Sequence, residues 1–325
     1  MQNFRQFLFV VFMFLGCLAI HAADDDLITE QVTVTLDEAG TLPDKITSAE
    51  KYKITNLKIV GEINGTDLRL IREMAGSNSS GSPTNGKLAF LDLSEAKIVK
   101  GGGYYYLFLN HYYRPDNDVV GPCFFYRCCS LTSVTLPPNI ISIGQRAFQN
   151  CSSLISITIP SSVTSIEMCA FQDCYQLTSV TLSSSITSMR SWAFSGCSSL
   201  PSITIPSSVT SVGAWAFCSC SSLTSVYVSW GAPISISTST FENVNTKSCI
   251  LYVPKGTYDN YRHTDWGIFD DIIEYDATGI KQVTTSGDAK EISRYSVNGQ
   301  RLDVPTKGLN IVKYSDGTVK KVVVQ

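Results

Sequence analysis

The stretch AFQNCSSLISITIPSSV, residues 147–163, decides the fold because its pattern recurs along the chain at a constant period of 23 residues. In each copy a phenylalanine is followed three residues later by a cysteine and six residues later by a leucine. A fixed period of this kind is the sequence signature of a solenoid, in which each repeat forms one coil. The five pairs are Phe125 and Cys128, Phe148 and Cys151, Phe171 and Cys174, Phe194 and Cys197, and Phe217 and Cys220.

Each coil is predicted to contain two short strands. In residues 156–159 isoleucines alternate with Ser156 and Thr158, which is the pattern of a half-buried strand. A turn follows over residues 160–162, then a second strand over residues 163–166 and a short helical turn over residues 170–177. One coil cannot bury its apolar side alone, so the coils must stack and need a cap at each end. The expected fold class is an α+β solenoid of parallel β-strands and short helical turns.

These repeats resemble the cysteine-bearing leucine-rich repeats of the BspA-like surface-antigen family, and residues 147–154 and 159–163 carry the resemblance. The resemblance implies a leucine-rich repeat stack and adhesion to host or bacterial surface proteins. Residues 65–68 and 91–94 resemble the amino-terminal region of many proteins of this family, which would cap the first coil. Residues 250–269 resemble the family's carboxy-terminal cap, in which an aromatic segment closes the stack.

Residues 1–23 have the features of a secretory signal peptide: Arg5, an apolar core, and small residues before a cleavage point after Ala22 or Ala23. We therefore expect an exported protein, either secreted or held at the cell surface or outer membrane. Lipidation of Cys17 is the alternative, and only then is membrane contact expected. The expected organisation is a signal peptide (1–23), an amino-terminal capping region with an aromatic insertion (24–118), the repeats (119–245), a carboxy-terminal cap (246–276), and a linker with a small β unit (277–325).

The last 35 residues are predicted to form that small β unit. Asn298-Gly299 and Asp316-Gly317 are hairpin signals between apolar strands. Residues 295–300, 308–312 and 320–324 resemble the end of type IX secretion sorting domains, although the earlier strands of such a domain are missing. A retained β appendage without a sorting role is the alternative.

The net charge of −3 and the lack of a basic stripe argue against nucleic-acid binding. The chain has 11 cysteines, of which five occupy one repeat position. We interpret these five as buried thiols that pack as small hydrophobic groups. Disulfides between adjacent coils are the alternative, because neighbouring strands lie only about 4.8 Å apart. Pairing among Cys123, Cys128 and Cys129, or between Cys218 and Cys220, is also open.

The sequence offers no catalytic constellation. His111 and His263 lack a sequence-adjacent metal partner, and the nucleophile elbow, P-loop, zinc-protease and dinucleotide motifs are all missing. The serines of the repeats have no nearby base, which a serine nucleophile needs. We expect no enzyme activity, cofactor or metal, and we interpret Gly101-Gly102-Gly103 as a hinge.

The leading hypothesis is therefore a non-enzymatic, adhesin-like protein that binds a surface protein through its repeat face. The same rows of hydroxyls could instead form a merely solvated face, and the tryptophans could pack across the coils. A glycan-binding module for polysaccharide capture is the alternative function, in which the tryptophans and a tyrosine-rich segment would stack on sugars. The candidate binding residues are Ser156, Thr158, Ser179, Thr181, Ser202, Thr204, Tyr227, Trp192 and Trp215.

That tyrosine-rich segment, residues 101–126, has two interpretations. It is either a protein-binding or sugar-stacking patch, or a packed insertion that closes the first coil. We favour the packed insertion, because several of these rings must cover the core of the repeats.

Overall fold

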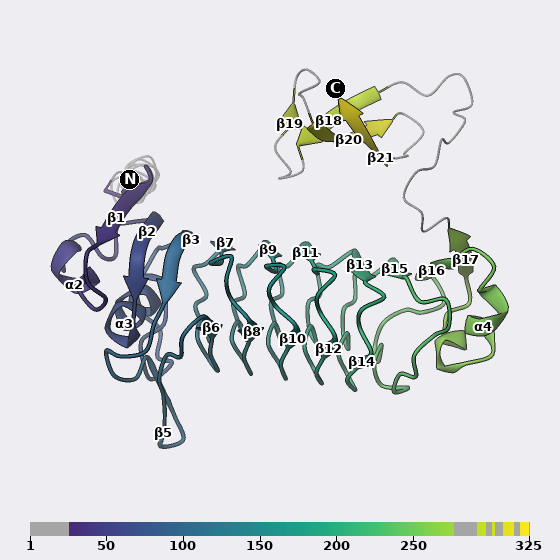
Figure 1. Cartoon of the computed structure of the whole chain (residues 1–325), viewed down its shortest axis with the longest axis horizontal. Helices are drawn as coiled ribbons and strands as arrows, with labels where there is room; N and C mark the ends of the chain where they lie inside the picture. The colour runs from purple at the N-terminus through teal and green to yellow at the C-terminus, as the bar shows by residue number, and fades with distance from the viewer. Residues whose placement is uncertain (1–25, 276–290, 297–300, 303–307, 315–318, 325) are drawn as a thin grey trace, which may run out of the picture. The chain divides into compact units, whose positions relative to one another are not determined.

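The computed structural model describes residues 26–275, 291–296, 301–302, 308–314 and 319–324 of the 325-residue chain. The chain divides into two units, Met1–Ala277 and Thr278–Gln325, which we describe separately. Within the first unit the coils lie side by side along one axis, from the purple amino-terminal strands to the green carboxy-terminal cap (Figure 1). This arrangement confirms the predicted solenoid.

Every coil contributes a strand to the front of the stack, and the repeats contribute a strand to a second sheet. The strands run parallel, and the register pairs equivalent residues of neighbouring coils, such as Ser179 with Ser156 and Thr181 with Thr158. The front strands are β1 (Val32–Leu36), β2 (Asn56–Ile63), β3 (Phe90–Ile98), β7 (Ser133–Thr135), β9 (Ser156–Thr158), β11 (Ser179–Thr181), β13 (Ser202–Ile205), β15 (Ser225–Val228), β16 (Ile250–Pro254) and β17 (Ile272–Tyr275). The second sheet contains β6 (Val119–Val120), β8 (Ser142–Ile143), β10 (Ser165–Ile166), β12 (Ser188–Met189) and β14 (Ser211–Val212).

Pro201 divides the front strands into two hydrogen-bonded sheets. In the coils before it, the N–H of Ile155 donates to Thr132 O at 2.9 Å and the N–H of Thr178 donates to Ile155 O at 2.8 Å. Pro201 occupies the equivalent position of the next coil and has no N–H to donate to Thr178 O. β11 and β13 therefore belong to separate sheets, while the second sheet continues from β6 to β14.

The turn side of each coil, defined as residues 167–174 and their equivalents, differs in part from the predicted helical turn. Its N–H groups do bond to carbonyls three residues earlier, as Ala170 does to Glu167 at 3.2 Å. Cys169 and Asp173, however, are left-handed, with φ of 58° and 59°, so no helix propagates. Their N–H groups donate to the next coil, at Ser191 O and Ser195 O. The turn side is thus a third ladder of bonds between coils.

A column of aromatic rings forms the core. Phe171 lies parallel to Phe148 and to Phe194, with ring centroids 5.1 Å apart on both sides. Phe241 continues the column at 5.4 Å from Phe217, although the spacing in the sequence is 24 residues here instead of 23. The rings that meet the two ends are tilted or edge-on, and they close the column: Phe124 and Tyr105 at one end, Phe269 and Trp266 at the other.

At the amino-terminal end, side chains replace the backbone donors of a missing coil. Arg72, on helix α3 (Gly65–Met74), is fully buried and donates to Phe124 O at 2.8 Å and to Tyr126 O at 3.0 Å. The hydroxyl of Tyr105 donates to Pro122 O at 2.7 Å. In later coils the equivalent carbonyls accept N–H groups from the preceding coil. Arg72 of α3 and Tyr105 therefore take the place of a preceding coil.

The segment that contains Gly101–Gly103 is not a hinge. Gly101 O accepts the N–H of Gly65, and Gly102 O accepts the hydroxyl of Thr66 and the guanidinium of Arg69. A Cβ on Gly102 would lie 2.0 Å from an oxygen of Asn64, at a φ of +66°. Gly102 is therefore needed for close packing against the start of α3, and all three glycines have a positive φ that other residues rarely adopt. Asn64 and Asp67 close the first turn of α3 as a capping box.

The remaining elements of the first unit are short. The carboxy-terminal cap is held by indole and phenol hydrogen bonds, from Trp266 to Ile234 O, from Trp230 to Val209 O and from Tyr261 to Trp230 O, each 2.8 Å long. None of the helices in the described residues has the length and hydrophobicity needed to cross a membrane. These short elements are α2 (Leu42–Lys45), the hairpin of β4 (Tyr106–Phe108) and β5 (His111–Tyr113), α4 (Tyr258–Arg262) and the 3-10 helix η1 (Asp265–Ile268).

The second unit is an antiparallel sheet in the order β19 (Arg301–Leu302), β18 (Glu291–Ser296), β20 (Gly308–Tyr314) and β21 (Val319–Val324). The predicted β unit is confirmed. The turn residues Asn298-Gly299 and Asp316-Gly317, the linker and the leader with Cys17 lie outside the described residues. The likeness to a sorting domain stays a prediction.

Candidate functional site

The front face, defined as the solvent-facing side chains of β7, β9, β11, β13 and β15, collects seven of the nine predicted binding residues. Their inward neighbours, such as Ile157 and Ile203, are buried, so the alternation assigned from the sequence is correct. The parallel register sets the residues in two rows across the strands. Ser156, Ser179 and Ser202 form one row, and Thr158, Thr181, Thr204 and Tyr227 form the other.

Hydroxyl groups elsewhere on the coils already form hydrogen bonds between neighbouring coils. Thr178 donates its hydroxyl to Ile155 O, Thr187 to Thr164 O, and Ser198 to Tyr175 O, each across one coil. These bonds explain much of the serine and threonine content as a link between coils. Within the described residues, Ser156, Thr158, Ser179, Thr181, Ser202 and Thr204 are all exposed and show no side-chain hydrogen bond. The front face therefore presents hydroxyl groups that remain available to a ligand.

Aromatic side chains lie at both ends of these rows. Phe90 on β3 pairs with Ser133 in the register and is 52% exposed. At the other end Tyr227 and Tyr252 stack face to face, 4.4 Å apart with an angle of 6°. Burial, followed by the neighbouring Tyr252, raises the pKa of Tyr227, so this phenol stays neutral. Sequence reasoning missed Phe90 and Tyr252, whose alternation with buried neighbours was the available signal.

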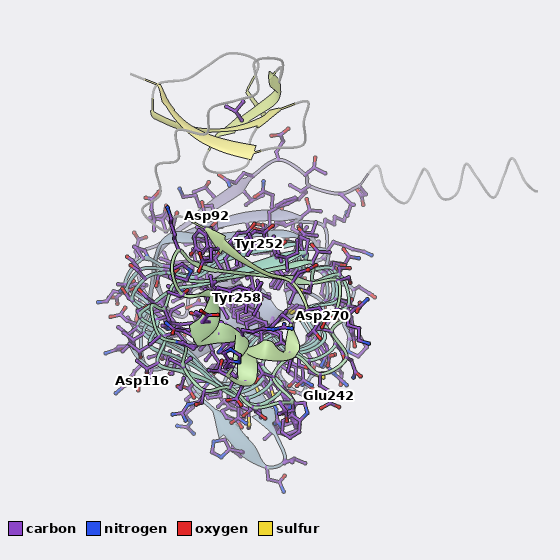
Figure 2. All side chains as sticks on the ribbon, turned by 90° about the vertical axis from the view of Figure 1, so that its right-hand side faces the viewer. Asp92, Asp116, Glu242, Tyr252, Tyr258 and Asp270 are labelled. Atoms are coloured by element: carbon purple, nitrogen blue, oxygen red, sulfur yellow. The ribbon has the colours of Figure 1, made fainter. Side chains whose placement is uncertain are left out.

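Charged side chains gather only at the amino-terminal end of the face. Lys58 pairs with Glu95 at 2.6 Å and lies 3.8 Å from Asp92, which continues the threonine row on β3. Figure 2 shows Asp92 and Tyr252 on the same, upper side of the first unit. The front face thus runs from a charged patch, across uncharged hydroxyls, to a tyrosine pair.

The two predicted tryptophans do not belong to this face. Trp192 and Trp215 lie on the turn side, one coil apart, with ring centroids 4.8 Å apart and an angle of 51°. The indole N–H of Trp215 donates to Glu242 at 2.8 Å, and Figure 2 shows Glu242 on the lower side, away from Tyr252. The tryptophans and the Ser/Thr rows therefore lie on different sides of the coil and do not form one continuous face. Their tilt also prevents the pair from forming one flat platform for a sugar.

The aromatic segment divides between the two interpretations given above. Tyr105 and Tyr106 are fully buried, and Tyr106 lies under the guanidinium of Arg72 at 4.5 Å, which fits a packed insertion. The tip of the hairpin is exposed instead, with Leu109 85% exposed and Tyr112 beside it in the solvent. The base of the segment closes the first coil, while its tip contributes nothing to the core.

The repeated cysteines serve the stack. Cys174 donates its thiol to Phe148 O at 3.2 Å, and Cys197 donates to Phe171 O at 3.3 Å. Burial raises the pKa of Cys220 to about 12 and that of Cys128 to about 11, which keeps these thiols protonated at neutral pH. The ten described cysteines form no disulfide with one another.

This arrangement predicts a two-class alkylation pattern. At pH 8 a thiol reagent should modify exposed Cys129 quickly and partly buried Cys218 more slowly, whereas eight buried cysteines should react only after unfolding without reductant. Raised thiol pKa values also mean that the stability contributed by these thiols is complete below about pH 7.5, where unfolded thiols begin to ionise, and decreases as the pH rises above it. Mass spectrometry of peptides would read out each site. A Cys151–Cys174 disulfide in native protein would contradict the assignment.

No chemistry converges on the two histidines. His111 and His263 are both exposed, and His111 lies 4.5 Å from the ring of Tyr113 in the hairpin. Among the described residues there is no cluster of three or more His, Cys, Asp or Glu side chains that could hold a metal ion.

Residues 118–249 match the sequence model of the family described as "BspA type Leucine rich repeat region", in six copies, which agrees with the six phenylalanines of the column. A leucine-rich repeat protein of T. pallidum is similar to the chain at 27% identity, with a TM-score of 0.34, over 44% of this chain and 75% of that one. One from Bacteroides ovatus has 24% identity and a TM-score of 0.33, over 45% of this chain and 49% of the other. A leucine rich cell surface protein from Faecalibacterium prausnitzii has 20% identity and a TM-score of 0.32, over 71% and 67%. Among curated proteins, no sequence matches this chain.

Proposed function

Because residues 118–249 are a BspA-type leucine-rich repeat region, we propose that this protein is a non-enzymatic, adhesin-like binder, displayed on the cell surface or secreted, whose front face recognises a host or bacterial surface protein. The leader over residues 1–23 would provide export. The repeats supply a rigid scaffold, and the ligand contacts the exposed side of the parallel strands.

The observation that supports this proposal is the contrast between the two sets of hydroxyl groups. Those of Thr178, Thr187 and Ser198 form hydrogen bonds between coils, whereas those of the six exposed serines and threonines on β9, β11 and β13 form no side-chain hydrogen bond in the described residues. Exposed Phe90 and the stacked Tyr227 and Tyr252 add the aromatic contacts that are common at the centre of protein interfaces. A protein partner would thus find many hydrogen-bonding groups between two aromatic anchors.

The lack of charge along β7 to β15 determines how binding should respond to salt. Without charged residues the face cannot steer a partner over long distances, so contact area and the aromatic anchors must supply the affinity. Binding through this face should depend only weakly on ionic strength. A steep salt dependence would instead implicate the patch around Lys58, Asp92 and Glu95.

Two lysine substitutions in the same coil test the proposal. Thr158→Lys places a charge in the middle of the front face, where a partner would have to desolvate it, and should weaken binding to host or bacterial cells about tenfold or more. Thr164→Lys is the matched control, because Thr164 is equally exposed but precedes β10 of the second sheet. Both variants should unfold as the wild type does, within about 0.5 kcal/mol. Equal binding by all three proteins would refute a front-face site.

A further inference from the structure

The turn side of the repeats carries a second arrangement of side chains that the stack does not need. Arg146, Cys169, Trp192 and Trp215 occupy the same position in successive coils, and all four are left-handed, with φ between 57° and 60°. Bulky residues rarely adopt this conformation, so packing alone does not favour tryptophan here. The indole of Trp215 is 37% exposed, while Trp192 is partly covered by its neighbours.

Glu242 lies against Trp215 of this pair and forms no ion pair in the described residues. Its carboxylate accepts the indole N–H of Trp215 at 2.8 Å, which fixes it at the edge of that ring. From residue 191 to residue 246 the sequence has no other charged residue. Glu242 is exposed and takes part in none of the ion pairs of the described residues. A single negative charge is therefore held at the edge of the Trp215 ring, and the nearest charged residues in the sequence are Arg190 and Lys247.

Such a combination is suited to an organic cation. A cation within about 6 Å of an indole centroid is attracted by the negative face of the ring, and a carboxylate at the edge of the rings adds a charged hydrogen bond. The two indoles meet at 51°, so their faces are oriented in different directions. A guanidinium fits best, because its plane stacks on an indole while its N–H groups reach both carboxylate oxygens.

We propose that Trp192, Trp215 and Glu242 form a binding site for an arginine side chain of a protein partner. The identity of the partner as a protein rests on the proposed function, but the site lies on a different side of the coil from the front face. The described residues already contain four contacts of this type, among them Arg72 at 4.5 Å from the centroid of Tyr106 and Arg146 at 5.4 Å from that of Phe108. The proposed site offers the indole rings for such a contact, and the partner would supply the arginine.

The four tryptophans make the site measurable in the full chain. With fluorine-labelled tryptophan, ¹⁹F NMR gives one signal for each indole, and the buried Trp230 and Trp266 serve as internal controls. The probe is N-acetyl-arginine amide, and its uncharged isostere N-acetyl-citrulline amide is the matched control. The signals of Trp192 and Trp215 should shift saturably with the arginine probe only. Equal shifts with the citrulline probe, or saturation by tetramethylammonium but not by arginine, would overturn the proposal.

Glu242→Gln separates charge from structure, because the glutamine carbonyl can still accept the indole N–H of Trp215. This variant should bind the arginine probe at least tenfold more weakly, with the Trp230 and Trp266 signals unchanged. If those control signals move, Trp192→Ala is the second variant, since the Trp192 side chain makes no hydrogen bond in the described residues, and it should lower the affinity similarly. Wild-type affinity in a folded variant would refute the site.

The two proposals can fail independently. The probe titration involves no partner and no front-face residue, so Thr158→Lys should bind the arginine probe as the wild type does. Conversely, Glu242→Gln should weaken cell binding while leaving the response to Thr158→Lys intact. Loss of probe binding in Thr158→Lys would show that the two sites are not separate and would overturn the assignment to the turn side.

Discussion

Replacing Phe171 with alanine should lower the free energy of unfolding by about 3–5 kcal/mol, the usual cost of removing a fully buried phenyl ring. Phe171 lies in the middle of the column, parallel to Phe148 and Phe194 at 5.1 Å on each side. Because each coil of a solenoid contacts only its neighbours, the cavity weakens two coil interfaces at once. Urea denaturation followed by circular dichroism would measure the loss.

Phe90→Ala is the matched control for this experiment. The side chain is of the same type, but it is 52% exposed on β3, so its removal should change stability by no more than about 0.5 kcal/mol. An unchanged denaturation midpoint for Phe171→Ala, or equal losses for the two variants, would contradict the central place of Phe171 in the core.

Replacing Arg72 with methionine should cost about 3–5 kcal/mol, because a hydrogen bond to a charged group contributes roughly 1.5–3 kcal/mol and several buried carbonyls lose such a donor at once. The methionine fills a similar volume but leaves the carbonyls of Cys123, Phe124 and Tyr126 without the donors that now lie 2.8–3.0 Å from them. These carbonyls lie at the amino-terminal end of the turn-side ladder, so local unfolding should begin at the amino-terminal coil. Hydrogen exchange should show faster opening near residue 125 than near residue 217.

Two further substitutions show whether the geometry of Arg72 matters. Arg72→Lys keeps the charge but loses the planar fork that reaches several carbonyls, and should recover only part of the stability. Lys97→Met removes a cation from an exposed pair with Glu62 and should cost less than about 1 kcal/mol. Full stability of Arg72→Met would mean that the cap does not depend on this side chain.

The repeat period was enough to predict the coil, its inward residues and its parallel stacking. Because Phe148, Phe171 and Phe194 are each separated by one period, they must occupy the same place in successive coils, and their rings do stack on one another. The alternation of Ile157 with Ser156 and Thr158 likewise identifies the outward rows without any tertiary information. Local patterns succeeded here because each coil contacts only copies of itself.

The ends of the stack and the turn side could not be predicted in the same way. Arg72 acts through carbonyls more than 50 residues away, which no local pattern reveals. The helical turn was expected from the spacing of Phe171, Cys174 and Leu177, but left-handed Cys169 and Asp173 are dictated by bonds to the next coil. The position of Trp215 relative to the front face depends on that same turn, so the sequence alone could not place it.

The claim that the front face contacts a protein partner can be tested most directly by site-specific photo-cross-linking. A benzoylphenylalanine at position 158 or at position 164 would be irradiated while the full chain is bound to host or bacterial cells. The account predicts a covalent adduct with a protein from position 158 and none from position 164, although both positions are exposed. Adducts from position 164 alone, or equal adducts from both, would contradict recognition through the front face.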